Sequence, residues 1–181
     1  GTNMPIQGAE YLDLIDRLEM DLRDTGYDSS SNPPGSEPRV PSGLSTMPKV
    51  ELKELYDRFL SFYDYISHVI VNDIGKQYIA KARLDTVEAT AFLKTANRKD
   101  LGNSELRRAS VEVDPDYVGA NKDYVFIKAR LAMSQIRVDV YKRAMERLGR
   151  ELWYRSKDDD TSPHFGESAK GPRNKYRRVD P

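Results

Sequence analysis

Residues 124–152 read YVFIKARLAMSQIRVDVYKRAMERLGREL, and this stretch decides the fold class. Its apolar and small residues recur at alternating steps of three and four, the pattern of a helix that packs along one face on a partner helix. This seam comprises Tyr124, Ile127, Leu131, Ser134, Val138, Tyr141, Met145, Leu148 and Leu152. We expect the helix to begin at Asp114-Pro115, because proline suits a first helical turn. Since acidic residues 158–160 oppose the helix dipole, it should fray before Asp158.

A second long helix is predicted from about residue 48 to residue 97, with Ser45 and Thr46 as candidate caps. Its first half has a seam of the same kind, at Leu52, Leu55, Phe59, Phe62, Ile66 and Val69. The stripe then drifts through Ile74, Tyr78, Leu84, Val87 and Ala91, and Gly75 is where a bend or break would be cheapest. Residues between the two helices are rich in Asn and Gly and predict a turn, in which residues 111–113 (VEV) could form a short strand.

Together these helices predict an all-α fold, a long antiparallel coiled-coil hairpin over residues 48–157, with a disordered tail over residues 158–181. A hairpin buries one side of each helix, yet the first helix also carries aromatic residues away from the seam. Its aromatic residues Phe59, Phe62, Tyr63, Tyr65 and Tyr78 together cover more than one face of the helix. We therefore expect a homo-oligomer, either a ring or a larger bundle, that covers the remaining apolar surface.

The N-terminal residues 1–26 predict a short acidic amphipathic helix. Its apolar stripe consists of Tyr11, Leu14, Ile15, Leu18 and Leu22. Residues 27–47 are dense in Ser, Pro and Gly and predict a disordered linker. The helix would then be a tethered peptide, which either folds back on its own core or binds a neighbouring subunit or partner through that stripe.

The composition fits one modest domain of 181 residues, of which 38% are hydrophobic and 32% charged, with a mean hydropathy of −0.71. The chain has no cysteine, which excludes disulfides and thiolate chemistry, and its two histidines disfavour a zinc site. No stretch has the length and hydropathy of a membrane span or the pattern of a signal peptide, which predicts a cytoplasmic protein that does not bind membranes. Nucleotide-binding and hydrolase motifs are also missing, so we expect neither an enzyme nor a cofactor.

The formal net charge is zero, but the charge is unevenly distributed. Residues 1–49 carry a net charge of −4, and residues 98–157 carry a net charge of +5. An acidic front and a basic back are typical of a chain with two kinds of partner, or of one that stacks head to tail.

The tetrad KARL occurs twice, at residues 81–84 and 128–131. In an antiparallel hairpin that turns near residue 106, Arg83 would face residue 129, so the tetrads would lie roughly opposite each other. Repeated around an oligomer, they would form a basic belt that follows a nucleic-acid backbone. The candidate binding residues are Lys81, Arg83, Lys128 and Arg130, with Arg98, Lys99, Arg107, Arg108 and Lys122 nearby. Chance repetition is the alternative, because all four residue types favour helices.

Tyr78 and Phe126 lie just upstream of the two tetrads. Both could stack on bases, although burial in the helical seam is the favoured interpretation.

The segment IAKARLD at residues 79–85, followed by a polar turn and a second long helix containing DVY and ERL, resembles the UvsY-like family of phage recombination mediators. The resemblance extends in layout over residues 50–155. It implies a small helical protein that assembles into rings, in which Lys81 and Arg83 contribute to single-stranded DNA binding. It also implies two protein partners, a recombinase and the single-strand-binding protein that covers the DNA.

The sequence therefore predicts a non-enzymatic single-stranded-DNA-binding mediator that helps load a recombinase. Two alternatives stay open. One is a phage structural or assembly protein, such as a small packaging subunit or a scaffold. The other is an adaptor that binds a partner through its N-terminal helix. Cationic side chains bind the phosphate backbones of DNA and RNA alike, so the sequence does not show which of the two nucleic acids is bound.

Overall fold

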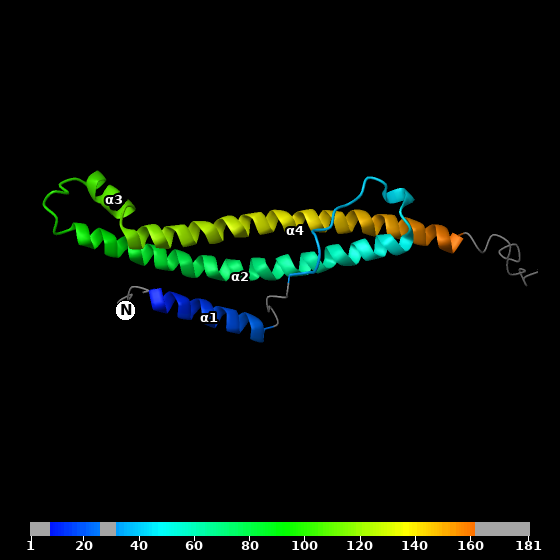
Figure 1. The fold of residues 1–181 in the computed structure, drawn as a ribbon, viewed down its shortest axis with the longest axis horizontal. Helices are drawn as coiled ribbons and strands as arrows, with labels where there is room; N and C mark the ends of the chain where they lie inside the picture. The colour runs from blue at the N-terminus through cyan, green and yellow to red at the C-terminus, as the bar shows by residue number, and fades with distance from the viewer. Residues whose placement is uncertain (1–7, 26–31, 162–181) are drawn as a thin grey trace, which may run out of the picture.

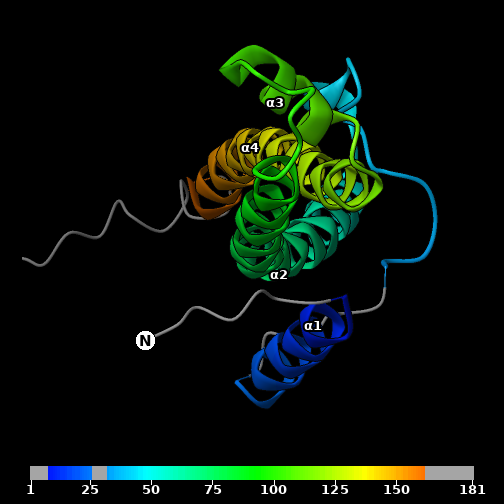
Figure 2. The ribbon, with the colours of Figure 1, turned by 90° about the vertical axis from the view of Figure 1, so that its left-hand side faces the viewer.

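The computed structural model describes residues 8–25 and 32–161, and within these ranges the chain is all-helical and contains no strand (Figure 1). The elements are α1 (Gly8–Asp24), the short 3₁₀ helix η1 (Leu44–Thr46), α2 (Lys49–Thr95), α3 (Ser104–Glu112) and α4 (Pro115–Thr161). α2 and α4 lie side by side and run in opposite directions. α1 and α3 lie on opposite sides of this pair (Figure 2). The predicted all-α class is confirmed.

The α2/α4 pair is held together by two apolar clusters separated by a polar layer. The buried members of the larger cluster are Leu44, Leu52, Phe59, Phe62, Ile66, Tyr141, Ala144 and Leu148. The smaller cluster joins Tyr11, Ala80 and Ile127. Between them lie the buried polar residues Asp73 and Ser134. All nine predicted seam positions of α4 are buried or half-buried, so that seam is confirmed.

The second half of the predicted α2 seam is wrong at two positions. Ile74 is 40% exposed and Tyr78 is 77% exposed. The buried positions are instead Asp73 and Ala80, which continue the seven-residue spacing from Ile66. Hydropathy does not score a carboxylate or a small side chain as core, and it therefore favours the larger neighbours Ile74 and Tyr78 over Asp73 and Ala80.

α2 is continuous through Gly75, where the sequence suggested a break. A Cβ atom at position 75 would lie 2.6 Å from Leu18 Cδ2 of α1. Gly75 therefore allows the close approach of α1 to α2, and this contact gives a reason for glycine in the middle of a helix.

The connection between the long helices contains α3, and the expected strand at residues 111–113 is wrong. Asn103 caps α3, because its Oδ1 accepts a hydrogen bond of 2.8 Å from the backbone N–H of Leu106. Asp114 Oδ1 accepts bonds from the backbone N–H groups of Asp116 and Tyr117 at the start of α4. Residues that look like turn formers in the sequence thus act largely as helix caps.

The C-terminal end of α4 also differs from the prediction, because the helix continues past Asp158 to Thr161. Asp159 Oδ2 lies 3.0 Å from the Lys49 ammonium group in the first turn of α2. In an antiparallel pair, the end of α4 meets the positive end of the α2 dipole, which favours a carboxylate there. The boundary expected between residues 157 and 158 is therefore wrong, and residues 162–181 lie outside the described part.

Residues 32–47 differ from the expected disordered linker, since they lie along the α2/α4 pair; the other expected linker residues, 27–31, lie outside the described part. We call residues 36–47 the strap. Leu44 and Pro38 are buried, and Arg155 of α4 donates hydrogen bonds to the backbone oxygens of Leu44, Ser45 and Met47. These bonds fix the path of the strap next to α4.

α1 packs against α2 of the same chain, which corresponds to the fold-back alternative. Of its apolar stripe, Tyr11 is buried, and Leu14, Ile15, Leu18 and Leu22 are half-buried. An ion pair of 2.7 Å joins Glu19 to Lys76 of α2.

Replacing Gly75 tests the contact with α1. Gly75→Ala improves the helix propensity of α2 by about 1 kcal/mol but pushes against Leu18. The matched control is Gly149→Ala in α4, because a Cβ atom there meets nothing within 4 Å. We expect the control to raise the free energy of unfolding by up to about 1 kcal/mol in urea titrations. Gly75→Ala should raise it less and should make α1 easier to cleave by a protease; equal gains with unchanged cleavage would contradict the contact.

Candidate nucleic-acid interface

The two KARL tetrads lie near each other but are offset from the predicted alignment. The Arg83 guanidinium lies 2.8 Å from Asp123 Oδ2, six residues before the predicted position 129. At the end of the pair where α3 connects the two helices, which we call the closed end, Lys94 of α2 lies 3.4 Å from Asp114. Because α3 fills the connection and α4 begins directly after it, the register is shifted relative to a turn centred on residue 106.

The two lysines of the tetrads come together around one ring. Lys81 Nζ lies 5.7 Å and Lys128 Nζ 5.8 Å from the centroid of the Tyr124 ring. Lys81 also forms an exposed ion pair of 2.8 Å with Asp85, and this bond raises the pKa of its ammonium group. Both lysines are exposed and could reach a ligand on this flank.

The two arginines of the tetrads are engaged within the fold. Besides its ion pair with Asp123, Arg83 stacks on Tyr11 of α1, with 4.6 Å between its Cζ atom and the ring centroid. Arg130 makes a bidentate contact with Asp73, with hydrogen bonds of 2.8 and 2.6 Å. These bonds raise the pKa of the guanidinium group of Arg130. Both side chains therefore stabilise the helix pair.

The other predicted basic residues are scattered around the closed end. Arg98 pairs with Asp100, Arg108 with Glu112, and Arg107 donates to the Leu101 carbonyl. Lys99 and Lys122 are exposed.

The favoured burial of Tyr78 and Phe126 is wrong. Both aromatic rings are exposed, Phe126 to 62%. Arg130 lies over the Phe126 ring, with its Cζ atom 5.4 Å from the centroid.

Replacing Arg130 should destabilise the fold. Arg130→Ala leaves the carboxylate of Asp73, which is 1% exposed, without its cation. Loss of one partner from a buried pair costs about 3 kcal/mol, the lower end of the usual range, because Arg130 is itself partly exposed. Lys128→Ala is the matched control and should change the free energy of unfolding by less than about 0.5 kcal/mol. Chemical denaturation followed by circular dichroism measures both, and equal effects would contradict a structural role for Arg130.

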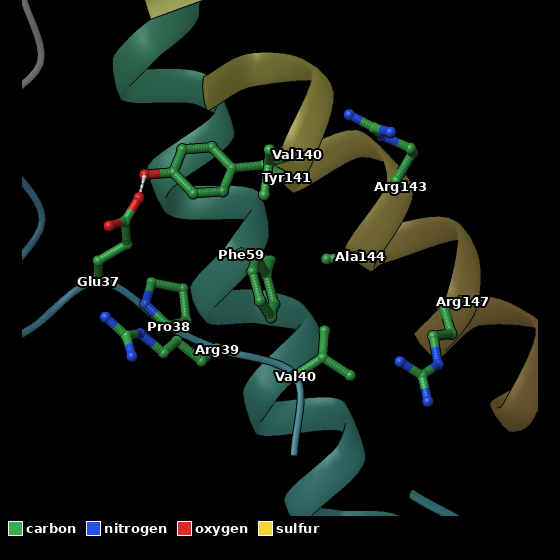
Figure 3. A pocket seen from close by; sticks show the side chains of 10 residues that line it. All are labelled: Glu37, Pro38, Arg39, Val40, Phe59, Val140, Tyr141, Arg143, Ala144 and Arg147. Atoms are coloured by element: carbon green, nitrogen blue, oxygen red, sulfur yellow. Dashed lines mark hydrogen bonds between the residues drawn. The ribbon is translucent and has the colours of Figure 1, made fainter. Parts of the chain in front are cut away.

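A second group of arginines, which the sequence analysis missed, lies at the other end of the pair. We call Arg39, Arg143, Arg147 and Arg150 the arginine face. Arg39 comes from the strap, and the other three come from α4. Figure 3 shows Arg39, Arg143 and Arg147 around a hollow of about 570 Å³ that also includes Phe59 and Tyr141.

Two more hollows lie next to this one along α4. Arg147 is shared with a hollow of about 390 Å³ that also involves Leu44, Arg150 and Tyr154. Arg150 and Tyr154 are in turn shared with a third hollow, which Trp153 lines. The rings of Trp153 and Tyr154 are 5.2 Å apart, and both residues are more than half exposed. The result is a row of adjacent hollows lined by arginines, each with one glutamate (Glu37, Glu151 and Glu146) at its edge, that ends at two aromatic rings.

The charges of the arginine face are free for a ligand. Among the described residues, Arg39, Arg147 and Arg150 form no ion pair. Arg143 makes a hydrogen bond of 3.3 Å to the backbone oxygen of Asp139. Residues 142–157 have six basic and two acidic side chains, a net charge of +4.

The carboxylate of Glu37 at the rim of the first hollow is occupied by its neighbours. It accepts a hydrogen bond from the Tyr141 hydroxyl (Figure 3). It also lies 3.6 Å from Arg137 Nε. Burial, followed by this hydrogen bond, raises the pKa of the Tyr141 phenol above its usual value. The phenol therefore stays protonated and keeps Glu37 at the rim.

The spacing of the arginines in the sequence is a signal that could have indicated this site. Arg143, Arg147 and Arg150 are spaced by four and three residues, which places them on one side of a helix, and an exposed aromatic pair follows one turn later. Arg39 has no such signal, because only the path of the strap brings it to α4.

Comparison with protein-family models, curated proteins and solved structures gives no match for this chain. In the part of the chain that the structure describes, no helix is long and apolar enough to cross a membrane. Across residues 8–25 and 32–161, no group of three or more metal-ligating side chains is placed to hold a metal ion.

Proposed function

We propose that this protein binds single-stranded DNA without acting as an enzyme, and that the arginine face is its principal contact. The observation that carries the proposal is the run of arginines without an ion pair along adjacent hollows that ends at Trp153 and Tyr154. Binding of single strands without sequence preference needs a cationic track for the phosphates and aromatic faces for the bases. The arginine face offers both on one side of α4.

The residue types and their placement support a phosphate ligand. Guanidinium groups suit phosphate because they offer several donors in one plane and stay charged at every physiological pH. Three of these arginines lie on α4, and the strap that carries Arg39 is fixed by Arg155. The track therefore has a defined spacing before a ligand arrives.

The lysines around Tyr124 would extend the contact. Lys81 belongs to the IAKARLD segment, which carries the resemblance to the UvsY-like mediators, and Lys128 lies beside it at the same ring. The resemblance implies a role in loading a recombinase onto DNA that a single-strand-binding protein covers, as a ring-shaped homo-oligomer. We adopt that role as the biological context of the proposed binding.

Two double variants that each remove two positive charges distinguish the sites. We expect Arg147→Ala with Arg150→Ala to lower the affinity for a labelled oligothymidylate and to flatten the dependence of log affinity on log salt by about 1.4, because each lost phosphate contact removes about 0.7. Fluorescence anisotropy across a salt series measures both quantities.

The matched control is Lys81→Ala with Lys128→Ala. If these lysines only extend the contact, the control should weaken binding less than the arginine variant does. The reverse order would move the site to the tetrads, and wild-type salt slopes in both variants would exclude both surfaces. The same series with an oligouridylate of equal length shows whether the protein prefers DNA to RNA.

A further inference from the structure

The arginines of α4 and the ring of Tyr154 form one stripe along the helix. Arg143, Arg147, Arg150 and Tyr154 follow each other at steps of four, three and four residues. This spacing keeps them within about 60° of each other around a helix of 3.6 residues per turn. The three arginines are exposed, and Tyr154 is 59% exposed and borders both the second and the third hollow. Tyr154 therefore lies in line with the cations.

Trp153 lies off this stripe, although it is the neighbour of Tyr154 in the sequence. A single residue step turns it by about 100° around the helix axis. On that side of α4 it shares the third hollow with the exposed Glu146, seven residues earlier. The residue seven positions before Tyr154 is instead Arg147. A phosphate beside Trp153 would thus meet a carboxylate, whereas a phosphate beside Tyr154 would meet guanidinium groups.

The ring of Trp153 is also covered by a cation. The ammonium nitrogen of Lys157 lies 4.0 Å from its centroid, and Tyr154 packs against it in an edge-to-face arrangement with an interplanar angle of 69°. In the described part of the chain, no cation lies over the Tyr154 ring. A base on the free face of Tyr154 would leave the contact between Lys157 and Trp153 in place, whereas a base on Trp153 would compete with it.

Two other exposed rings, Phe126 and Tyr78, lack a comparable track of cations. The cation over Phe126 is Arg130, which Asp73 holds with two hydrogen bonds. Lys81, three residues after Tyr78, forms an ion pair with Asp85. Tyr154, by contrast, follows Arg147 and Arg150, which form no ion pair within the described residues. An exposed ring and available guanidinium groups therefore coincide at Tyr154.

We propose that Tyr154 is the ring on which a base stacks, and that this contact makes the arginine face select single strands over duplexes. A cationic track alone attracts single strands and duplexes alike, since both carry phosphates. The ring adds a contact that only an unpaired base can make, because the bases of a duplex are already stacked on each other. Because the base would lie in the same site, this role of Tyr154 rests on the proposed function.

Matched leucine variants of the two neighbouring rings test the assignment. Both rings are more than half exposed, so neither replacement should disturb the fold, which circular dichroism checks. We expect Tyr154→Leu to lower the affinity for a labelled oligothymidylate at least about fivefold, the lower end of what stacking of one base contributes. Trp153→Leu is the matched control and should lower it less. In both variants the dependence of affinity on salt should stay that of the wild type, because no charge is removed.

Two more measurements test whether the contact is a stacking contact. Tyr154→Phe should bind the oligothymidylate like the wild type, because stacking needs the ring and not the hydroxyl group. When the oligothymidylate is first paired with its oligoadenylate complement, Tyr154→Leu should bind this duplex as the wild type does. Fluorescence anisotropy at one salt concentration measures all of these affinities.

Several outcomes would overturn the role of Tyr154. They are an equal or larger loss in Trp153→Leu, a phenylalanine variant as weak as the leucine variant, and an equal loss of duplex binding. Wild-type affinity in Tyr154→Leu would overturn it too, and the proposed function would stand if Arg147→Ala with Arg150→Ala still flattened the salt dependence. A wild type that binds no oligothymidylate would overturn both.

Discussion

The contact between Asp73 and Arg130 fixes how the two long helices align. A carboxylate that is almost completely buried in the middle of α2 needs a cation with the right geometry, and Arg130 provides two hydrogen bonds to it. Sliding α4 by one heptad would preserve most of the apolar seam, but in one direction Asp123 would replace Arg130 and set two carboxylates together. In the other direction Arg137 would replace Arg130, but Arg130 would then take the place of Asp123 beside Arg83 and set two cations together. A seam of repeating heptads is degenerate by itself, and a single polar pair can select one register from several. The ion pair between Arg83 and Asp123 belongs to the same register.

That register decides which basic groups remain for a partner. It places the arginines of both KARL tetrads against carboxylates and leaves the two lysines around Tyr124. At the other end of the pair it brings Tyr141 between Phe59 and Phe62, with ring centroids 6.1 Å apart in both cases. From there the Tyr141 hydroxyl reaches Glu37 and holds the start of the strap. The position of Arg39 in the arginine face thus depends on the alignment of helices far from it in the sequence.

Much of the fold follows from local patterns, whereas the site follows from long-range ones. The seam from Tyr124 to Leu152 predicted α4 and the all-α class, because spacing and residue type agree at every step. The α2 seam failed where Asp73 and Ala80 replace large apolar residues, since hydropathy assigns neither to a core. The strap was expected to be disordered from its Ser, Pro and Gly content, but Leu44 and the hydrogen bonds from Arg155 compensate part of the ordering entropy. The KARL repeat is visible in the sequence, but whether its arginines are available to a partner depends on Asp73 and Asp123 elsewhere in the chain.

The Tyr141 side chain belongs to two parts of the molecule at once, because its ring lies in the apolar core and its hydroxyl group reaches the rim of the first hollow. An occupant of that hollow would therefore be thermodynamically linked to the folding of this end of the helix pair. A ligand that binds only the native form adds RT ln(1 + [L]/Kd) to stability, which is about 2.7 kcal/mol at a hundredfold excess over Kd. Amide protons around Phe59 and Tyr141 would then exchange more slowly with solvent than those near Tyr124. The pattern of slowed exchange would show which part of the α2/α4 pair holds the ligand.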